Sequence, residues 1–314
     1  MDQIKLNTKS LSSFQKSYSR RGCSRRQVSP VASLKRSVVI LPGLGNNKND
    51  YDELSQDLRE CYDFHVEVVP VRRLDWARNA SGLFDRNYWR STLSPRPTVD
   101  WYLSRVNDTV SKVREENEGP VTILAHSAGG WLGRLYLLDF GFRGIDRFVS
   151  LGSPHTPPPP GVVDQTRGIL TFISQQTPGA FHEEIDYTTV AGKFIKGAKL
   201  FGKHGSLGSK VTGLGYQQVC GDPEVWGDGV VPIPSAHLDG ALQINLDGVY
   251  HSPLGSSMPA DQKVSVEENG NLDSDDFDES DAATSVGRPW YGSKSILPLW
   301  VECINSTPST LVAD

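Results

Sequence analysis

The stretch "VTILAHSAGGWLGRLYLL", Val121 to Leu138, decides the expected fold. Its first four residues are mostly apolar and β-branched, which predicts a short buried strand. In its second half the apolar residues recur at helical spacing, and those on one face are Trp131, Leu132, Leu135 and Leu138. Ser127 stands between the two halves. The order therefore predicts a strand, a tight turn that carries a serine, and a helix.

Small residues surround Ser127, with Ala125 two positions before it and Gly129 two positions after it. A serine at a strand-to-helix turn in the pattern G-x-S-x-G is typical of a nucleophile elbow. Ala125 replaces the first glycine of that pattern and is small enough to let the helix pass close to the strand. The alternative is a serine that only caps the helix. A nucleophile needs a base, an acid that orients the base, and donors for an oxyanion.

The composition indicates a globular protein. The chain has 314 residues, 37% of them hydrophobic and 22% charged, which predicts a packed core. The net charge of −5 argues against a nucleic-acid partner. No apolar run approaches the roughly 18 residues that span a membrane. The four cysteines are scattered without metal-ligand spacing, which predicts reduced thiols. We expect neither a metal nor a cofactor.

Residues 1–36 differ in kind from the rest. They are rich in serine, lysine and arginine, and Asp2 is their only acidic residue. They contain no apolar stretch of the secretory kind, and their composition is typical of an organellar transit peptide. The serine content favours a plastid, the stroma of the chloroplast, with the mitochondrion or the cytoplasm as alternatives. A disordered basic tail without a targeting role is the other interpretation.

Strands and helices alternate along residues 37–314, which we interpret as one domain. Strands are expected within 37–47, 63–71, 121–124, 144–154, 185–194 and 241–249, and helices within 49–61, 98–119 and 129–138. Such alternation predicts an α/β fold with a mostly parallel, doubly wound sheet and helices on both faces. Ligands bind at the carboxyl ends of the strands in such sheets, so the loops that follow strands matter most.

The loop after the first strand reads "LPGLGNN" and precedes a helix. Backbone N–H groups in such a loop can donate to an oxyanion. We expect the N–H groups of Leu44 and Ala128 to form this pair, with Gly43 and Gly45 near the substrate. The alternative is an ordinary turn rich in glycine and proline.

Two later loops carry the other groups that a serine nucleophile needs. Asp228 lies between two glycines in "WGDGVVP", and His251 follows the last expected strand in "GVYHSP". A carboxylate that orients a histidine base would complete a triad. Ser127, Asp228 and His251 also follow the chain order nucleophile, acid, histidine of one hydrolase class. Asp222 is a second candidate for the acid, and His155 in "SPHTPPPP" is a competing base that breaks this order.

At this point the chain from about residue 37 to 253 resembles the α/β-hydrolases of the lipase and esterase kind. Within them it is similar to the branch related to GPI inositol-deacylase-like lipases of plants and cyanobacteria. The segments that carry the resemblance are "VVILPGLG", "LAHSAGG", "SLGSPHTPP", "WGDGVVP", "GVYHSP" and the late "WYGS". The resemblance implies Ser127 as nucleophile, Asp228 as acid and His251 as base. It also implies the N–H groups of Leu44 and Ala128 as oxyanion donors. We further expect His126 and His155 to lie near the substrate. Pro42 departs from the histidine that many lipases carry there.

The expected reaction is hydrolysis of a carboxylic ester through an acyl-serine. Transfer of the acyl group to an alcohol, or hydrolysis of a thioester, would use the same triad. A hydrolase fold that binds a small ligand without catalysis is the alternative from another class. A small-molecule or lipid acyl ester is the expected partner, and the sequence makes no prediction of oligomeric state.

Three further segments have expected roles. Residues 72–97 and 161–179 are insertions that could cover the site as lids. Residues 193–210 are basic with interleaved apolar residues, which predicts either a contact with a membrane surface, on a helical face of Phe194, Ile195, Ala198 and Phe201, or a solvated loop. Residues 261–287 are acidic and poor in apolar residues, which predicts a disordered insertion, after which the chain is expected to pack back as a terminal helix.

Overall fold

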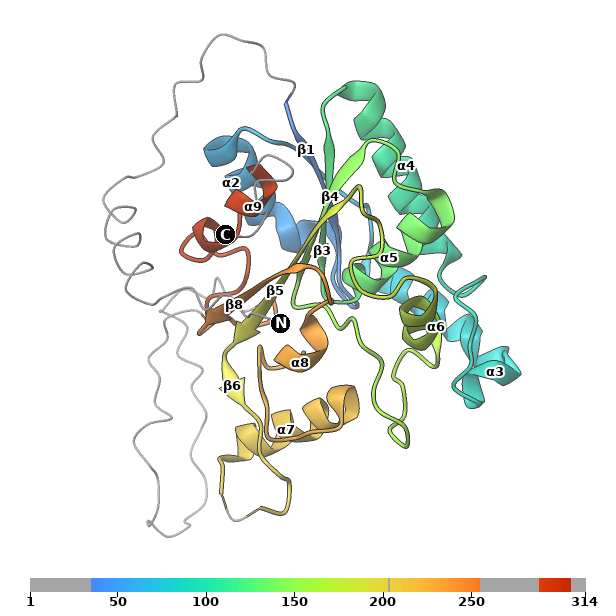
Figure 1. Ribbon diagram of the computed structural model, residues 1–314, viewed down its shortest axis with the longest axis vertical. Coiled ribbons are helices and arrows are strands. Elements are labelled where there is room, and N and C mark those ends of the chain that lie inside the picture. Colours follow the sequence, from blue (N-terminus) through green and yellow to red (C-terminus); the bar gives the residue numbers. More distant parts are fainter. Residues whose placement is uncertain (1–34, 203, 255–287, 306–314) are drawn as a thin grey trace, which may run out of the picture.

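A six-stranded parallel sheet forms the centre of the computed structural model (Figure 1). The structure describes residues 35–202, 204–254 and 288–305. Most of the expected transit peptide and the acidic insertion at 261–287 lie outside the described residues. The strand order is β2-β1-β3-β4-β5-β8, and every pairing in it is parallel. The strands are β1 (Ser37–Leu41), β2 (His65–Val68), β3 (Val121–His126), β4 (Ile145–Leu151), β5 (Asp186–Lys193) and β8 (Leu242–Asp247).

The central strands are buried on both faces, as a parallel sheet between helices requires. All residues of β1 and β3 are buried, and the two strands pair from Ser37 with Val121 to Leu41 with Ala125. Successive side chains of a strand point to opposite faces. Val39 and Leu41 accordingly join one core cluster, while Val38 and Ile40 join the other. The expected doubly wound parallel sheet is confirmed.

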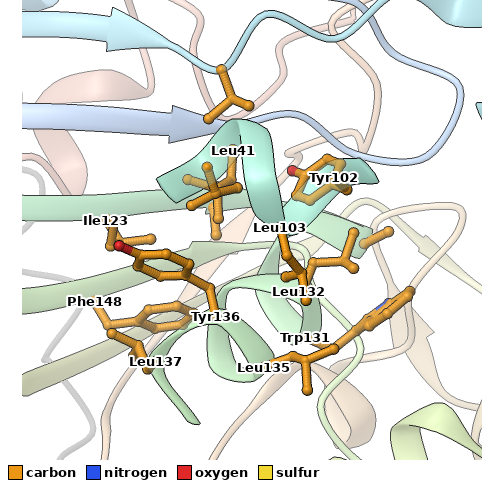
Figure 2. Close-up of a cluster of buried hydrophobic side chains, with 14 of the residues drawn as sticks. Leu41, Tyr102, Leu103, Ile123, Trp131, Leu132, Leu135, Tyr136, Leu137 and Phe148 are labelled. Carbon is orange, nitrogen blue, oxygen red and sulfur yellow. The ribbon is translucent and has the colours of Figure 1, made fainter. Parts of the chain in front are cut away.

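Helices pack on both faces of the sheet. The first core cluster joins β1 and β3 to α4 (Asp100–Glu116), α5 (Ala128–Phe140) and α6 (Ile169–Gln176), and Figure 2 shows its side chains. The second joins the opposite face to α2 (Asp52–Tyr62) and to the segment 290–304. The remaining helices are η1 (Lys48–Tyr51), η2 (Arg73–Phe84), α3 (Arg86–Trp89), α7 (Leu207–Cys220), α8 (Ile233–Ala236), η3 (Leu297–Leu299) and α9 (Glu302–Asn305). None of these described helices is both long and apolar enough to cross a membrane.

Two expectations about helices are wrong. The segment 194–201 forms no amphipathic helix, because Ile195–Lys196 is a strand, β6, that pairs with β7 (Trp226–Gly227). Strand pairing outweighs the helical spacing of its apolar residues. The segment 288–305 is mostly turns with the short η3 and α9, because Gly292 and Pro298 interrupt a continuous helix.

The two expected insertions are folded parts of the domain. Residues 72–97 contain η2 and α3, and Trp76 within η2 belongs to the first core cluster. Residues 161–179 contain α6, whose Ile169, Leu170 and Ile173 belong to the same cluster. Both segments are therefore held by buried side chains.

The helix α5 passes so close to β1 that a side chain at Gly129 would overlap the carbonyl oxygen of Leu41. Backbone cannot give way as a flexible side chain does. We expect Gly129→Ala to lower the free energy of unfolding by about 2 kcal/mol, although alanine is the better helix former. Urea unfolding followed by circular dichroism measures this.

Gly215 within α7 is the matched control, because a side chain added there meets no atom within 4 Å. Gly215→Ala should raise the free energy of unfolding by about 0.5–1 kcal/mol. If the two substitutions changed the free energy of unfolding in the same direction and by the same amount, the close approach of α5 and β1 would be contradicted.

Candidate active site

Ser127 occupies a strained turn between β3 and α5. Its φ of 52° and ψ of −125° lie in a region that side chains rarely adopt. The turn is held by the Ser127 N–H, which donates to the Leu151 carbonyl at 3.0 Å, and by the Gly130 N–H, which donates to the Ser127 carbonyl at 3.0 Å. The Ser127 hydroxyl makes no capping hydrogen bond to α5. The turn thus projects the hydroxyl away from the helix, as a nucleophile elbow does.

Three side chains from distant parts of the chain form one hydrogen-bonded series. His251 Nε2 lies 3.0 Å from Ser127 Oγ, and His251 Nδ1 lies 2.7 Å from Asp228 Oδ2. Asp228 is completely buried, His251 is 7% exposed and Ser127 is half-buried. Because a carboxylate only accepts, Nδ1 carries the proton and Nε2 can accept from the serine hydroxyl. The structure therefore brings together the three residues expected from the sequence.

Hydrogen bonds on both oxygens hold the Asp228 carboxylate in its charged form. Oδ1 accepts from the N–H groups of Val230 at 3.0 Å and Val231 at 2.7 Å, and Oδ2 accepts from the Tyr291 hydroxyl at 2.7 Å. Burial alone would raise the pKa of Asp228. The charge and hydrogen bond of His251, together with the Tyr291 and Val231 donors, outweigh it and lower that pKa below its usual value.

Small residues at the ends of β4 and β5 make room for this carboxylate. A side chain at Gly152 would lie 2.5 Å from Asp228 Oδ2, and one at Gly192 would lie 2.8 Å from Asp228 Cβ. Gly152 also has a φ of 54°. Glycine satisfies both the backbone angle and the close approach. The ends of β4 and β5 thus pack directly against Asp228.

Tyr291 is a residue that sequence reasoning missed as part of the site. Its hydroxyl accepts from the Gly192 N–H at 2.8 Å while it donates to Asp228. Its backbone carbonyl accepts from Trp300 Nε1 at 2.8 Å, which fixes the segment 290–300. The sequence "WYGS" marked this place only through a resemblance, because no local pattern reveals a contact between residues 63 positions apart.

His126 and Tyr51 form a second buried series behind the first. The Gly43 N–H donates to the Tyr51 hydroxyl at 3.0 Å, and that hydroxyl lies 2.8 Å from His126 Nδ1. His126 Nε2 lies 2.9 Å from the His251 carbonyl. These partners require a proton on Nε2 and none on Nδ1. The series ties the loop after β1, the serine turn and the His251 loop together.

His126 does not face a substrate, contrary to expectation. It is 1% exposed and both ring nitrogens have protein partners. Burial lowers its pKa to about 3, since a charged imidazole would lose its hydration there. Its place is structural, between the loops that carry the site.

The loop from Pro42 to Asn46 touches the serine turn. A side chain at Gly43 would lie 2.7 Å from Ser127 Cβ. The loop is held by the Tyr102 hydroxyl, which donates to the Pro42 carbonyl at 2.8 Å, and by Trp76 Nε1, which donates to the Asn46 carbonyl at 2.9 Å. Tyr51 already takes the Gly43 N–H, so Gly43 is no oxyanion donor.

Leu44 and Ala128 are the next residues on the two segments that meet at Ser127. Leu44 is 62% exposed and is followed by Gly45, whose φ is 78°. Ala128 is the first residue of α5, where backbone N–H groups lack helical partners and the helix dipole favours negative charge. Leu44 follows Gly43, which approaches Ser127, and Ala128 follows Ser127 itself.

The competing candidates lie elsewhere. His155 is 1% exposed, its Nε2 lies 2.8 Å from Ser150 Oγ, and burial lowers its pKa well below the usual value. It belongs to the interior and faces no substrate, contrary to expectation. Asp222 is exposed and its carboxylate accepts from the Glu224 N–H at 2.8 Å, as in an ordinary turn. Neither belongs to the series that ends at Ser127.

One group of side chains has the donor types of a metal site. His65, Glu67 and Glu116 offer ligand atoms within 4.8 Å of one another. Lys112 Nζ already lies 3.2 Å from a Glu67 oxygen and 3.7 Å from a Glu116 oxygen. The lysine offsets part of the negative charge of the two carboxylates, and the group lies at β2, away from the serine turn.

The similarity of this chain to known proteins lies among solved structures, at low sequence identity. It matches none of the family models, and no curated protein matches it. Among solved structures, a Bacillus licheniformis lipase in its mature form is 14% identical with a TM-score of 0.46, covering 73% of this chain and 89% of that one. A metagenomic carboxyl esterase is 14% identical with a TM-score of 0.48, covering 90% and 78%. A poly(3-hydroxybutyrate) depolymerase from Bordetella parapertussis is 16% identical with a TM-score of 0.42, covering 72% and 76%.

The sheet itself identifies the architecture. Six parallel strands lie in the order β2-β1-β3-β4-β5-β8 between two helical layers. A strained serine turn joins β3 to α5, and the loops that follow the strands gather around it. The chain therefore has the α/β-hydrolase fold.

The depressed pKa of His126 makes stability depend on pH. The unfolded imidazole titrates near pH 6.5, whereas the folded one stays neutral down to about pH 3. Between these values the unfolded chain binds one more proton, so stability falls as the pH falls through 6.5. From about pH 7.5 to about pH 5.5 we expect His126 to account for a loss of about 1.4 kcal/mol.

Urea unfolding of the wild type and of His126→Gln at both pH values measures this contribution. The variant is expected to be less stable at each pH but to lose about 1.4 kcal/mol less between them. Other buried histidines, such as His155, contribute equally to both proteins and cancel. An identical pH dependence in the two proteins would show that His126 is charged in the folded state.

Proposed function

We propose that this chain is a serine hydrolase that cleaves carboxylic esters through an acyl-serine intermediate. The observation that carries the proposal is the unbroken series from Ser127 Oγ through His251 to the buried Asp228 carboxylate, at 3.0 and 2.7 Å. An activated nucleophile is recognised by a base within hydrogen-bond distance and by a third group that orients the base. Both conditions are met at a strained turn of the α/β-hydrolase fold.

The geometry supports two steps of acyl transfer. His251 Nε2 takes the hydroxyl proton as Ser127 Oγ attacks the ester carbonyl, and then returns the proton to the leaving alcohol. Water attacks the acyl-serine in the same manner. Asp228 remains a carboxylate throughout, since its four hydrogen-bond donors favour the charged form. It holds the proton of His251 on Nδ1 and stabilises the imidazolium.

The negative oxygen of the tetrahedral intermediate needs donors that are already in place. The N–H groups of Leu44 and Ala128 are the proposed pair, because the segments that carry them meet at Ser127. One such donor contributes roughly 3 kcal/mol to transition-state stabilisation in comparable enzymes. The hydrogen bonds of Tyr102 to Pro42 and of Gly43 to Tyr51 hold the loop after β1 in place. Little reorganisation of this loop is therefore needed during the reaction.

We propose a carboxylic ester as the class of substrate. Thioesters and acyl transfer to an alcohol use the same three residues, and the membership of the GPI inositol-deacylase-like branch rests on the resemblance of short segments.

A fluorophosphonate probe tests for an activated serine. We expect the wild type to be labelled, and Ser127→Ala and His251→Ala to lose labelling, since one lacks the nucleophile and the other lacks the base. Ser252→Ala is the matched control: this half-buried serine is next to His251, and its hydroxyl accepts from the Leu254 N–H. It should be labelled like the wild type.

The products then separate the remaining candidates. Release of free acid from p-nitrophenyl esters supports hydrolysis, and an acyl ester formed with added alcohol supports transfer. A folded wild type that neither reacts with the probe nor cleaves any ester would contradict the proposal and favour a binding protein.

Tyr291 is proposed as a positioning residue for Asp228. Tyr291→Phe removes one donor from a buried carboxylate, a bond worth about 1.5–3 kcal/mol, and leaves the ring in place. We expect kcat for a p-nitrophenyl ester to fall about tenfold with KM unchanged, because the orientation of His251 suffers and substrate contacts do not.

Tyr136→Phe is the control, since Tyr136 is 4% exposed and lies in the core around α5. It should leave kcat unchanged. Equal kcat in Tyr291→Phe and the wild type would remove Tyr291 from the site.

A further inference from the structure

Four large apolar side chains of one short segment are exposed to solvent. Leu74 is 88% exposed, Leu83 43%, Phe84 94% and Trp89 69%. All belong to η2 or α3, between Arg73 and Trp89. Single exposed apolar residues are ordinary, whereas several within one segment indicate an interaction surface.

Buried contacts attach this segment to the rest of the domain. Its exposed apolar residues therefore lie on an ordered part of the chain. Trp76 is 8% exposed, and its ring lies 5.3 Å from that of Trp101 and 5.4 Å from that of Tyr102. The Leu93 N–H donates to the Arg167 carbonyl at 2.8 Å, and the Arg167 guanidinium lies 4.6 Å from the Tyr88 ring. In Figure 1, α3 stands out from the body of the molecule beside α6.

The same segment is basic in an acidic protein. Residues 72–90 hold five arginines and two aspartates, a net charge of +3, whereas the whole chain carries −5. The arginines are all exposed, and they are Arg72, Arg73, Arg78, Arg86 and Arg90. Arg73 pairs with Asp50 and Arg78 with Asp75. Among the ion pairs of the described residues, none involves Arg72, Arg86 or Arg90.

One end of this surface contacts the loop after β1. A cavity of about 470 Å³ lies at its edge, lined among others by Asn47, Lys48, Arg72, Arg73 and Leu74. The Lys48 N–H donates to the Val71 carbonyl at 2.9 Å, which joins the loops after β1 and β2. The loop after β1 is the one that touches Ser127 through Gly43. The end of the segment at Arg72 is therefore joined to the candidate active site through the loop after β1.

We propose that residues 72–90 form a docking surface for an anionic lipid bilayer, with Leu74, Phe84 and Trp89 entering the interfacial region and Arg72, Arg86 and Arg90 contacting the lipid head groups. Tryptophan and phenylalanine favour the membrane interface, and arginines are attracted to anionic head groups. The combination of exposed aromatic rings with unpaired cations matches both parts of such a surface. Docking here is independent of the proposed hydrolysis.

A second exposed apolar patch lies at Leu200 and Phe201. Phe201 is 97% exposed and Leu200 43%, within the segment that the sequence indicated as a membrane contact. The neighbouring Lys199 is paired with Glu224 at 2.8 Å. Phe201 thus provides a control: a fully exposed aromatic ring on the same protein, close in sequence to a lysine that is held in an ion pair.

Co-sedimentation of the full chain with vesicles tests the proposal. The vesicles hold phosphatidylcholine and phosphatidylglycerol at roughly two to one, and pure phosphatidylcholine is the neutral reference. We expect Phe84→Ser/Trp89→Ser to weaken binding to the anionic vesicles at least tenfold, and Arg86→Gln/Arg90→Gln to weaken it by about tenfold. Phe201→Ser should stay within about twofold of the wild type. High salt should weaken binding of the wild type, because it screens the arginines.

The comparison is made within the full chain, so that any binding by residues 1–34 is common to all variants. Equal binding of the wild type and both double variants would overturn the proposal, as would a loss confined to Phe201→Ser. A wild-type dimer without lipid that Phe84→Ser/Trp89→Ser dissociates would also overturn it, since a second copy would then cover the surface. Ser127→Ala should bind like the wild type, which separates docking from the proposed hydrolysis.

Discussion

The buried carboxylate of Asp228 is the constraint on which the rest of the site depends. A completely buried charge is costly unless donors surround it, and here four donors come from three places in the chain: the adjacent Val230 and Val231 N–H groups, His251 and Tyr291. Each donor must lie within hydrogen-bond distance of one carboxylate. The loop after β7, the loop after β8 and the segment 290–300 are therefore held to a single point at the ends of β4 and β5.

The serine side of the site is held by close packing instead of charge. Gly129 lets α5 approach the backbone of β1, and the turn that results places Ser127 in a strained conformation. The buried series from Gly43 through Tyr51 and His126 to the His251 carbonyl then joins this turn to the other half. His126 must stay neutral to keep its hydrogen bonds to Tyr51 and to the His251 carbonyl. The serine turn and the His251 loop are therefore linked by a group that does not titrate in the folded protein near neutral pH.

The surface of residues 72–90 extends the same framework to the outside. Trp76 is part of the core and donates to the Asn46 carbonyl, so one side chain supports both the loop beside Ser127 and the segment that carries Phe84 and Trp89. A lipid surface bound at this segment would stand in a fixed relation to the serine turn. The docking surface would therefore determine which ester bonds of a bound lipid come within reach of Ser127.

The sequence by itself determined the parallel sheet, the serine turn and the order Ser127, Asp228, His251, because buried strands, small residues at a turn and loops after strands are local patterns. It misjudged residues 194–201, where strand pairing outweighs helical spacing, and it placed His126 and His155 near the substrate, where burial keeps both away from it. Tyr291, Tyr51 and the exposed face of residues 72–90 were decided by tertiary structure alone. A hydrogen bond between residues 63 positions apart, or the exposure of one side of a short helix, depends on how distant segments pack, and no local pattern encodes it.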